Sequence, residues 1–324
     1  MVLLKRVLRS PVGAQVLRRL AWTVPTLVFI TLITFIAGDL APGDPAVRKA
    51  GMHGGQEAVE LIREKMGLNR PLHVRYAEFV WNAAHFEFGE SLVTPRAVNE
   101  IVLTGIQHTG RIALLAILLA SGVGILLGGI AAIWRNRVAD RLAVSFSTLG
   151  ICIPNFVLAP VLVYIFAIWL DRLPVAWRDD PERGPWIYLI LPVAIMALRP
   201  AAVITRLTRA SMIDTLSQDF IRTAYAKGVP FWRTIIVHAL RNSLVPIMTA
   251  VGTSLGFLLT GSFIIETAFL IPGLGSASID AIRKADYPVI QATVLIFAVL
   301  FIAVNLLVDL LLPLIDPRIK EGAA

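Results

Sequence analysis

One polar stretch, residues 218–246, lies between two long apolar runs and carries the residue types best suited to contact a partner. Its four cations outnumber the single acid Asp219: Arg222, Lys227, Arg233 and Arg241. Guanidinium and ammonium groups form charge-assisted hydrogen bonds with carboxylates. The composition therefore predicts either a docking segment for another protein or a basic loop that only faces water.

Two short helices account for the spacing within this stretch. Four apolar side chains at helical spacing mark the first helix: Phe220, Ile221, Ala224 and Tyr225. Gly228 suits the end of this helix because glycine takes left-handed backbone angles without strain. A second helical pattern follows it. If the first helix docks on a partner, we expect Ala224 to face the partner's groove, where a small side chain permits close approach.

Patterns typical of catalysis or metal binding are missing from the sequence. No Gly-Lys dipeptide occurs, so the chain lacks the phosphate-binding loop of ATPases. The five histidines show neither HExxH nor His-x3-His spacing, and no Ser-His-Asp arrangement can be proposed. The sequence thus predicts a chain that is not an enzyme, binds no metal or cofactor and hydrolyses no ATP by itself.

Arg199 is the one charge inside an otherwise apolar run, and Pro200 follows it. A charged side chain within a membrane span is costly and usually faces a pathway or a partner. Alternatively, the span is shifted along the sequence and the Arg199 side chain reaches to the membrane surface. The sequence alone leaves both interpretations open.

The elements that position these residues follow from composition. The chain has 324 residues, of which 56% are hydrophobic and 16% charged, and its mean hydropathy of +0.74 is too high for a soluble core. A spanning helix needs about 20 apolar residues. Six runs approach or exceed that length: Leu20–Gly38, Ile112–Trp134, Leu142–Leu170, Gly184–Thr205, Ser243–Ile265 and Tyr287–Val308. We therefore expect an all-α membrane protein with six transmembrane helices.

Charge predicts the orientation of these spans. The chain begins with basic residues and no acid, and its first apolar run is too long for a signal peptide. The positive-inside rule places both termini in the cytoplasm, with residues 206–241 inside and residues 45–105 outside. The net charge of +8 thus reflects membrane orientation, and we expect no nucleic-acid partner.

The region before the second span predicts two amphipathic helices packed on the outer face of the membrane domain. One has Ala58, Leu61, Ile62 and Met66 on a single face and stops at Gly67, and the other begins at Pro71. Asp44, within PGDP, is expected to hydrogen-bond locally. The predicted parts are an N-terminal region (1–107), a membrane core (108–313) that includes the polar segment 217–246, and a cytoplasmic tail (314–324).

Small residues and prolines within the runs predict how the spans pack. The pairs Gly124–Gly128 and Gly252–Gly256 permit close helix approach. Three prolines within runs predict kinks or broken helices: Pro154, Pro160 and Pro192.

The sequence RTAYAKG at Arg222–Gly228, followed by HALRN, resembles the EAA motif of ATP-binding-cassette (ABC) importer permeases in its dipeptide and oligopeptide (DppB/OppB-type) variant. Arg222, Thr223 and Ala224 take the Glu-Ala-Ala places, so only Ala224, Gly228 and Leu240 match the general motif outright. Further stretches resemble this family in order, among them APGDP, GLNRP, FGESL, ETAFLIPGLG, DAIRKADYPVIQ and NLLVDLLLPLIDPRI.

This resemblance implies a type I ABC importer permease in the bacterial inner membrane. It implies a homologous second permease subunit, two cytoplasmic ATPases that bind ATP and Mg²⁺, and an extracytoplasmic substrate-binding protein. Three acids between the last two spans would contact that protein or line an outer vestibule, although a solvated loop is equally consistent: Glu266, Asp280 and Asp286. The segment expected to couple to the ATPases comprises Phe220, Arg222, Thr223, Ala224, Tyr225, Ala226, Lys227 and Gly228.

Peptides are the expected cargo, and other functions remain as alternatives. The same machinery could import nickel chelates, glutathione or oligosaccharides. An ion-coupled secondary transporter is disfavoured because acids avoid the interiors of the predicted spans. An intramembrane enzyme is disfavoured because the spans show no catalytic pair.

Overall fold

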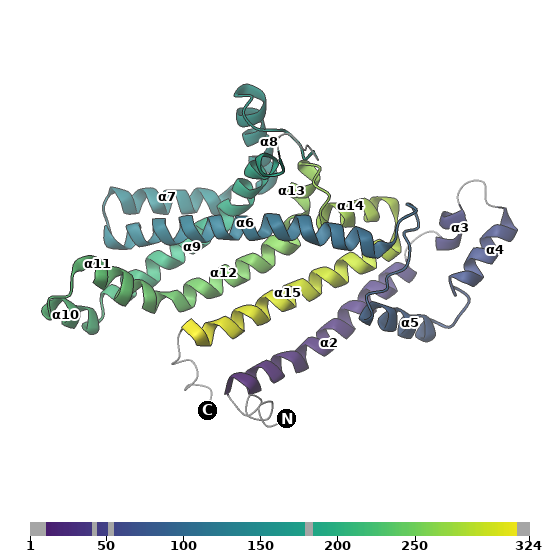
Figure 1. The fold of residues 1–324 in the computed structure, drawn as a ribbon, viewed down its shortest axis with the longest axis horizontal. Coiled ribbons are helices and arrows are strands. Elements are labelled where there is room, and N and C mark those ends of the chain that lie inside the picture. The colour runs from purple at the N-terminus through teal and green to yellow at the C-terminus, as the bar shows by residue number, and fades with distance from the viewer. Residues whose placement is uncertain (1–10, 41–43, 51–54, 179–183, 316–324) are drawn as a thin grey trace.

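The computed structural model describes residues 11–40, 44–50, 55–178 and 184–315, and this part of the chain forms an elongated all-helical array (Figure 1). In order, its helices are α2 (Pro11–Asp39), α3 (Pro45–Ala50), α4 (Gln56–Lys65), α5 (Leu72–Ala84), α6 (Val98–Ile133), α7 (Val138–Cys152), α8 (Asn155–Val163), the π-helical η1 (Tyr164–Trp169), α9 (Trp186–Leu216), α10 (Asp219–Ala226), α11 (Phe231–Arg233), the π-helical η2 (Thr234–Leu240), α12 (Arg241–Gly261), α13 (Phe263–Ala268), α14 (Leu274–Lys284) and α15 (Tyr287–Ile315). No β-strand occurs within these ranges, which confirms the predicted all-α class.

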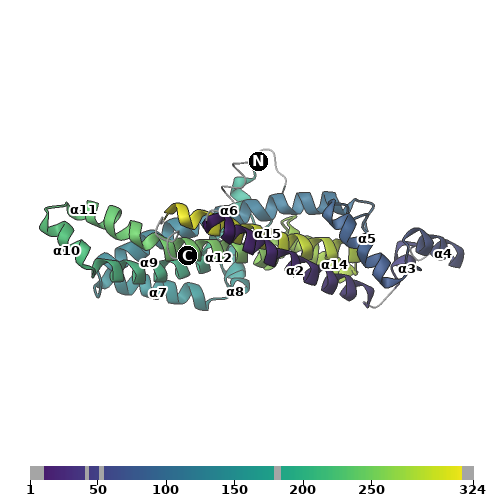
Figure 2. The same ribbon diagram turned by 90° about the horizontal axis from the view of Figure 1, so that it is seen from below.

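Figures 1 and 2 show that α10 and α11 lie at one end of the array and that α3, α4 and α14 lie towards the other. We name these the α10 end and the α14 end. The long helices run between them, so segments that the sequence assigns to opposite membrane faces lie far apart.

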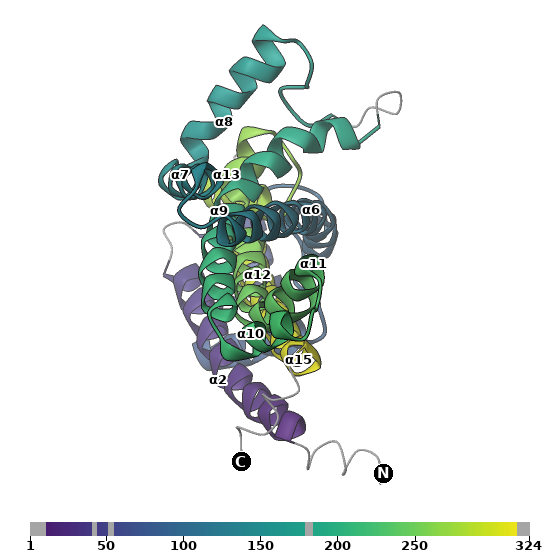
Figure 3. The same ribbon diagram turned by 90° about the vertical axis from the view of Figure 1, so that its left-hand side faces the viewer.

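Five helical stretches of the described chain are long and apolar enough to cross a membrane, and a bent pair makes a sixth. The break in the bent pair lies within the predicted run Leu142–Leu170 and confirms the break predicted at Pro154. The helix direction bends by 103° between its two arms, α7 and α8 with η1. Pro154 explains the break, because proline disfavours helical angles in the residue before it, and Ile153 is extended with φ −81° and ψ 116°. Figure 3 shows α8 projecting away from the other helices.

Several helices extend beyond the apolar runs that predicted them. α6 begins at Val98 instead of Ile112, and α9 continues to Leu216 instead of Thr205. Polar residues extend a helix as readily as apolar ones when its backbone bonds continue, so hydropathy marks only the part within lipid. Pro192 lies inside the uninterrupted α9.

The core forms where α6 and α9 pack along each other, joined by α12. Small residues make this approach possible. A side chain at Gly124 would place its Cβ 2.7 Å from Ile204, and one at Gly128 would lie 2.6 Å from the carbonyl oxygen of Thr205. Gly252 and Gly256 meet α15 in the same way. The predicted close-packing role of both glycine pairs is confirmed.

Only one of the two predicted amphipathic helices packs on a span. α5 lies against α2, where Phe35 contacts the rings of Tyr76 and Phe79, and Arg75 pairs with Asp39 at 2.7 Å. The prediction is wrong for α4, which packs chiefly against the short helix α3 and not against a span.

Local features of this region follow the sequence more closely. Asp44 accepts a hydrogen bond from the backbone N–H of Ala46 at 2.9 Å and pairs with Arg63, so its local role is confirmed. Gly67 follows α4 with φ +66°, as expected for a glycine at a helix end.

Candidate functional site

The polar stretch forms the predicted helix, α10, and Gly228 ends it. Gly228 has φ +75° and donates its N–H to the carbonyl of Tyr225 at 2.9 Å. The N–H of Val229 reaches the carbonyl of Ala224 at 3.1 Å. These two bonds make a Schellman motif, which satisfies carbonyls at the helix end and requires left-handed angles. The predicted position and conformation of Gly228 are confirmed.

α10 is fixed to its own chain by one side. Ile221 is 2% exposed and Ala224 8% exposed, and Ile221 shares a cluster with Met212 of α9 and with Ile235 and Ala239 of η2. The expectation that Ala224 faces a partner's groove is therefore wrong. The four apolar side chains at helical spacing divide into two sets: Ile221 and Ala224 are buried, whereas Phe220 and Tyr225 are exposed. An amphipathic helix buries one stripe of its surface and leaves the rest outside.

The other side of α10 carries exposed aromatic and cationic side chains. Phe220 and Tyr225 are each 43% exposed, and Trp232 of α11 is 58% exposed. The remaining residues of the segment are exposed as well: Arg222, Thr223, Ala226 and Lys227. The Arg222–Asp219 pair, at 3.3 Å between highly exposed groups, contributes little stability. Aromatic side chains and Arg are enriched in protein interfaces.

A π-helical segment joins this end to a span. η2 follows α11 directly and continues into α12 without a break, and α10 packs against it. Thr234, Ile235 and Ala239 of η2 are buried. Movement of α10 would therefore act on α12 through packed side chains. Apolar periodicity predicts a helix here but cannot distinguish π-helical from α-helical bonding.

Arg199 lines a cavity of about 820 Å³ between α9 and α12. Its side chain is exposed, and it is the only charged residue among the described lining residues. The remaining lining residues are Asn155, Met196, Pro200, Val203, Leu207, Pro246, Thr249, Ala250, Thr253, Ser254, Phe257, Leu258 and Gly261. That Arg199 faces a translocation pathway stays a prediction, but it opens onto a space large enough for a small ligand.

The sequence analysis missed the other wall of this cavity. Thr249, Thr253 and Phe257 recur every four residues along α12 and so lie on one face. This polar and aromatic stripe within an apolar run was the available signal. The Thr249 and Thr253 hydroxyl groups donate hydrogen bonds to backbone carbonyls one turn earlier in α12, at 3.0 Å and 2.9 Å respectively.

Glu266 is not the surface acid that the sequence suggested. Its side chain is 0% exposed and lies in α13. Thr109 of α6 and Ser262 donate their hydroxyls to Glu266 Oε1 at 2.7 and 2.5 Å, and the N–H of Ser276 donates to Oε2 at 3.0 Å. Because these donors satisfy the carboxylate within the chain, the expected contact with a binding protein is withdrawn for Glu266.

Asp286 is likewise internal, at 4% exposure. It accepts hydrogen bonds from the hydroxyl of Ser91 and, at 3.1 Å, from the N–H of Leu92. It thereby fixes the loop before α6, and the binding-protein contact is withdrawn for it too. Asp280 is exposed on α14, so its contact with a partner stays a prediction.

One ion pair near the α10 end was not predicted from the sequence. Asp140, in the first turn of α7, binds Arg209 of α9 through both carboxylate oxygens, at 2.5 and 2.8 Å. Asp140 also accepts the N–H of Asn136 at 2.8 Å. The sequence showed only one acid in a basic loop, and its partner lies 69 residues away.

These features define a class: a polytopic membrane subunit with a ligand-sized cavity between spans and an exposed aromatic and cationic face at one end. Comparison with known proteins supports the assignment. Residues 124–321 match the family "Binding-protein-dependent transport system inner membrane component", and residues 14–93 match the N-terminal model of the same system.

The chain belongs to this family and is an ABC importer permease of the peptide and oligopeptide type, a multi-pass inner-membrane protein. It is similar to the glutathione transport system permease protein GsiC of Escherichia coli (strain K12) and of Salmonella typhimurium (strain LT2). Each is 38% identical over 305 residues, which cover 94% of this chain and 98% of the relative.

Proposed function

We propose that this permease forms half of the path by which an ATP-driven importer takes up peptides or glutathione. The observation that carries the proposal is the Arg199 cavity. A guanidinium group binds a carboxylate through two parallel hydrogen bonds. Thr253, Ser254 and Asn155 offer polar groups for peptide amides, while Met196 and Phe257 offer apolar contact.

Among the alternative cargoes, the cavity favours those that carry a carboxylate. No acid occurs among its described lining residues, so a cationic ligand would find no counter-charge there. Glutathione, the cargo named for the relatives, is a tripeptide-like molecule with two carboxylates and one ammonium group. Dipeptides and glutathione therefore remain equal candidates, ahead of oligosaccharides and metal chelates.

The α10 surface is proposed to dock on a cytoplasmic ATPase. Closure of two ATPase subunits on ATP and Mg²⁺ would displace α10, and the buried contacts of Ile221 would transmit this displacement to η2 and α12. α12 lines the cavity, so the displacement would reach the cargo path. Converting a 1:99 mixture of inward- and outward-facing states to 99:1 requires about 5.5 kcal/mol. This chain supplies none of that energy itself.

The partners follow from the same proposal. A homologous second permease would complete the path, and an extracytoplasmic binding protein would deliver cargo to the opposite end. The orientation would place α10 in the cytoplasm and α3 to α5 outside, with both termini cytoplasmic.

Cysteine labelling tests this orientation. The single native cysteine, Cys152, is exposed and is first replaced by serine. Glu60→Cys, in α4, should then react with an impermeant maleimide in intact cells, whereas Gln218→Cys should react only after the cells are permeabilised. The reverse pattern would contradict the orientation.

Uptake by the importer reconstituted in vesicles tests the cargo and the role of Arg199. Radiolabelled glutathione and trialanine should enter with ATP, and trialanine amide should compete less well than trialanine. Arg199→Gln should lower uptake about tenfold and abolish that difference, because its carboxylate partner is lost. Arg206→Gln, an exposed arginine on the same helix outside the cavity lining, is the control. Normal uptake by Arg199→Gln would remove Arg199 from the pathway.

A further inference from the structure

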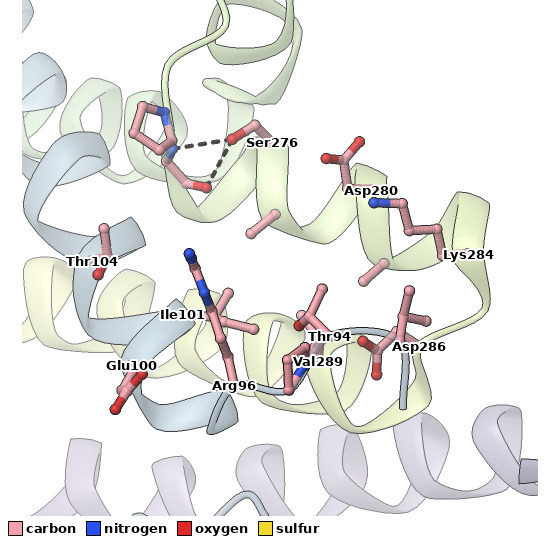
Figure 4. A pocket seen from close by; sticks show the side chains of 16 residues that line it. Thr94, Arg96, Glu100, Ile101, Thr104, Ser276, Asp280, Lys284, Asp286 and Val289 are labelled. Carbon is pink, nitrogen blue, oxygen red and sulfur yellow. Dashed lines mark hydrogen bonds between the residues drawn. The ribbon is translucent and has the colours of Figure 1, made fainter. Parts of the chain in front are cut away.

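A second hollow, of about 640 Å³, lies at the α14 end (Figure 4). The loop at 93–96, the first turns of α6 and one face of α14 form its walls, and it shares no lining residue with the Arg199 cavity. Figure 4 shows the Arg96 side chain reaching between α6 and α14, with Asp280 and Lys284 on the α14 wall. Glu100 lies on the α6 wall.

The walls of this hollow are held by groups that are already satisfied. Asp286 fixes the loop through Ser91 and the N–H of Leu92. Glu266 receives the N–H of Ser276 at 3.0 Å, and the Ser276 hydroxyl donates to the carbonyl of Ile271 at 2.7 Å. The first turn of α14 is therefore fixed in place before any ligand arrives, as an affinity site requires.

Apart from Asp286, the charged side chains that line the hollow form no such bonds. The side chains of Arg96, Glu100, Asp280 and Lys284 are exposed, and none of these side chains forms an ion pair or a hydrogen bond with another described residue. The backbone carbonyl of Lys284 accepts a hydrogen bond from Arg48 Nη1 at 2.6 Å. Besides the hydrogen-bonded Asp286, two cations and two acids thus face a concave space with apolar residues between them, including Ile101. A ligand that carries one charge of each sign would satisfy both sets.

We propose that this hollow binds the free ammonium and carboxylate groups of a small zwitterionic peptide, with Arg96 on the carboxylate and Asp280 on the ammonium. The inference rests on the proposed function, because it gives the cargo a second position on this chain. The volume lies within the range of small-molecule sites, whereas protein partners dock on broader and flatter surfaces. This concavity favours a peptide over the surface of a binding protein.

Titration calorimetry on the complete importer in lipid nanodiscs, without ATP or binding protein, tests the proposal. All variants carry Arg199→Gln so that the other cavity does not contribute. The probes are trialanine, trialanine amide and N-acetyltrialanine. Amidation should weaken binding about tenfold, since a charge-assisted hydrogen bond is lost, and acetylation should do the same.

Single substitutions in the hollow show which residue is responsible for each loss of affinity. In Arg96→Gln, trialanine should bind about tenfold more weakly, and amidation should have no further effect. In Asp280→Asn, trialanine should likewise bind about tenfold more weakly, and acetylation of its amino group should have no further effect. Arg283→Gln and Glu87→Gln remove exposed charges outside the hollow and should bind like the parent protein.

Three outcomes would overturn the proposal. The parent protein could fail to bind trialanine at millimolar concentration, or Arg96→Gln could retain the full penalty for amidation. In the third, Arg96→Gln would weaken retention of the binding protein while leaving trialanine binding unchanged, which would make the hollow a protein docking surface. Peptide and glutathione uptake by the importer with Arg199 intact is measured in parallel. If peptide is taken up but one of these three outcomes occurs, only the proposal of a second binding site is overturned. If neither peptide nor glutathione is taken up, the proposed function itself is overturned.

Discussion

The two ends of this permease use charged residues in opposite ways. At the α14 end, Glu266 and Asp286 are buried and accept hydrogen bonds from distant parts of the same chain. At the α10 end, Arg222 and Lys227 face outward beside exposed aromatic rings. The α14 end is held together by its own acids, whereas the α10 end leaves its cations and aromatic rings exposed.

This difference in burial separates residues with a structural role from residues proposed to bind a partner, which their positions in the sequence do not. Both sets lie in short segments between spans, and both are rich in charge. Burial decides the role: removal of a buried carboxylate leaves its donors unsatisfied, whereas removal of an exposed cation costs the fold little. Stability and assembly should therefore respond to mutations at different ends.

The largest loss of stability is expected for Glu266→Ala. Thr109, Ser262 and the N–H of Ser276 would lose their acceptor in a buried site, at a cost of about 2–5 kcal/mol. Thermal unfolding of the purified permease in detergent measures this cost. Asp280→Ala, at the exposed neighbour, should unfold like the wild type, and equal melting temperatures for both variants would break the comparison.

A smaller loss, about 1–3 kcal/mol, is expected for Asp140→Ala, because the partly exposed Arg209 regains water when its partner is removed. This variant shows whether the stability of the α10 end also depends on an ion pair within the chain. The same unfolding assay measures it, with Asp219→Ala, which removes a highly exposed acid, as the control. A loss as large as that of Glu266→Ala would show that the ends are braced equally.

Gly228→Val should cost about 1–2 kcal/mol, from the left-handed backbone alone. A Cβ at Gly228 meets no atom within 4 Å, so crowding contributes nothing. Gly228→Asn should recover most of the loss, since Asn tolerates these angles. If Asn and Val destabilise equally, the Schellman motif is not the cause.

Most predictions that depend on neighbouring residues in the sequence succeeded, although Pro192 does not interrupt α9. The glycines at 67 and 228 end helices, and Pro154 breaks one, because each effect follows from local backbone angles. Gly124 and Gly128 permit close packing because they share one helix face. Apolar runs indicated the spans, although not their polar ends.

The predictions that failed concerned which residues distant parts of the chain cover. Glu266 is buried because Thr109, 157 residues earlier in the chain, bonds to it. Ala224 faces inward because η2, formed by later residues, covers that side of α10. A single sequence shows which residues could form a surface, but not which of them the chain covers.

The central claim is that the exposed face of α10 binds the ATPases while its buried face holds it to the span. The Phe220→Ala, Tyr225→Ala double variant tests it most directly. The readouts are co-purification of the ATPases with the tagged permease and peptide-stimulated ATP hydrolysis by the reconstituted importer. Trp81→Ala, which truncates a 68% exposed aromatic residue of α5, is the control.

We expect the double variant to reach the membrane and unfold like the wild type. Its recovery of ATPase and its stimulated hydrolysis should fall about tenfold or more, as when interface aromatic residues are truncated, while Trp81→Ala retains both. Wild-type recovery and stimulation in the double variant would show that the exposed face of α10 is only a solvated surface and would contradict the claim.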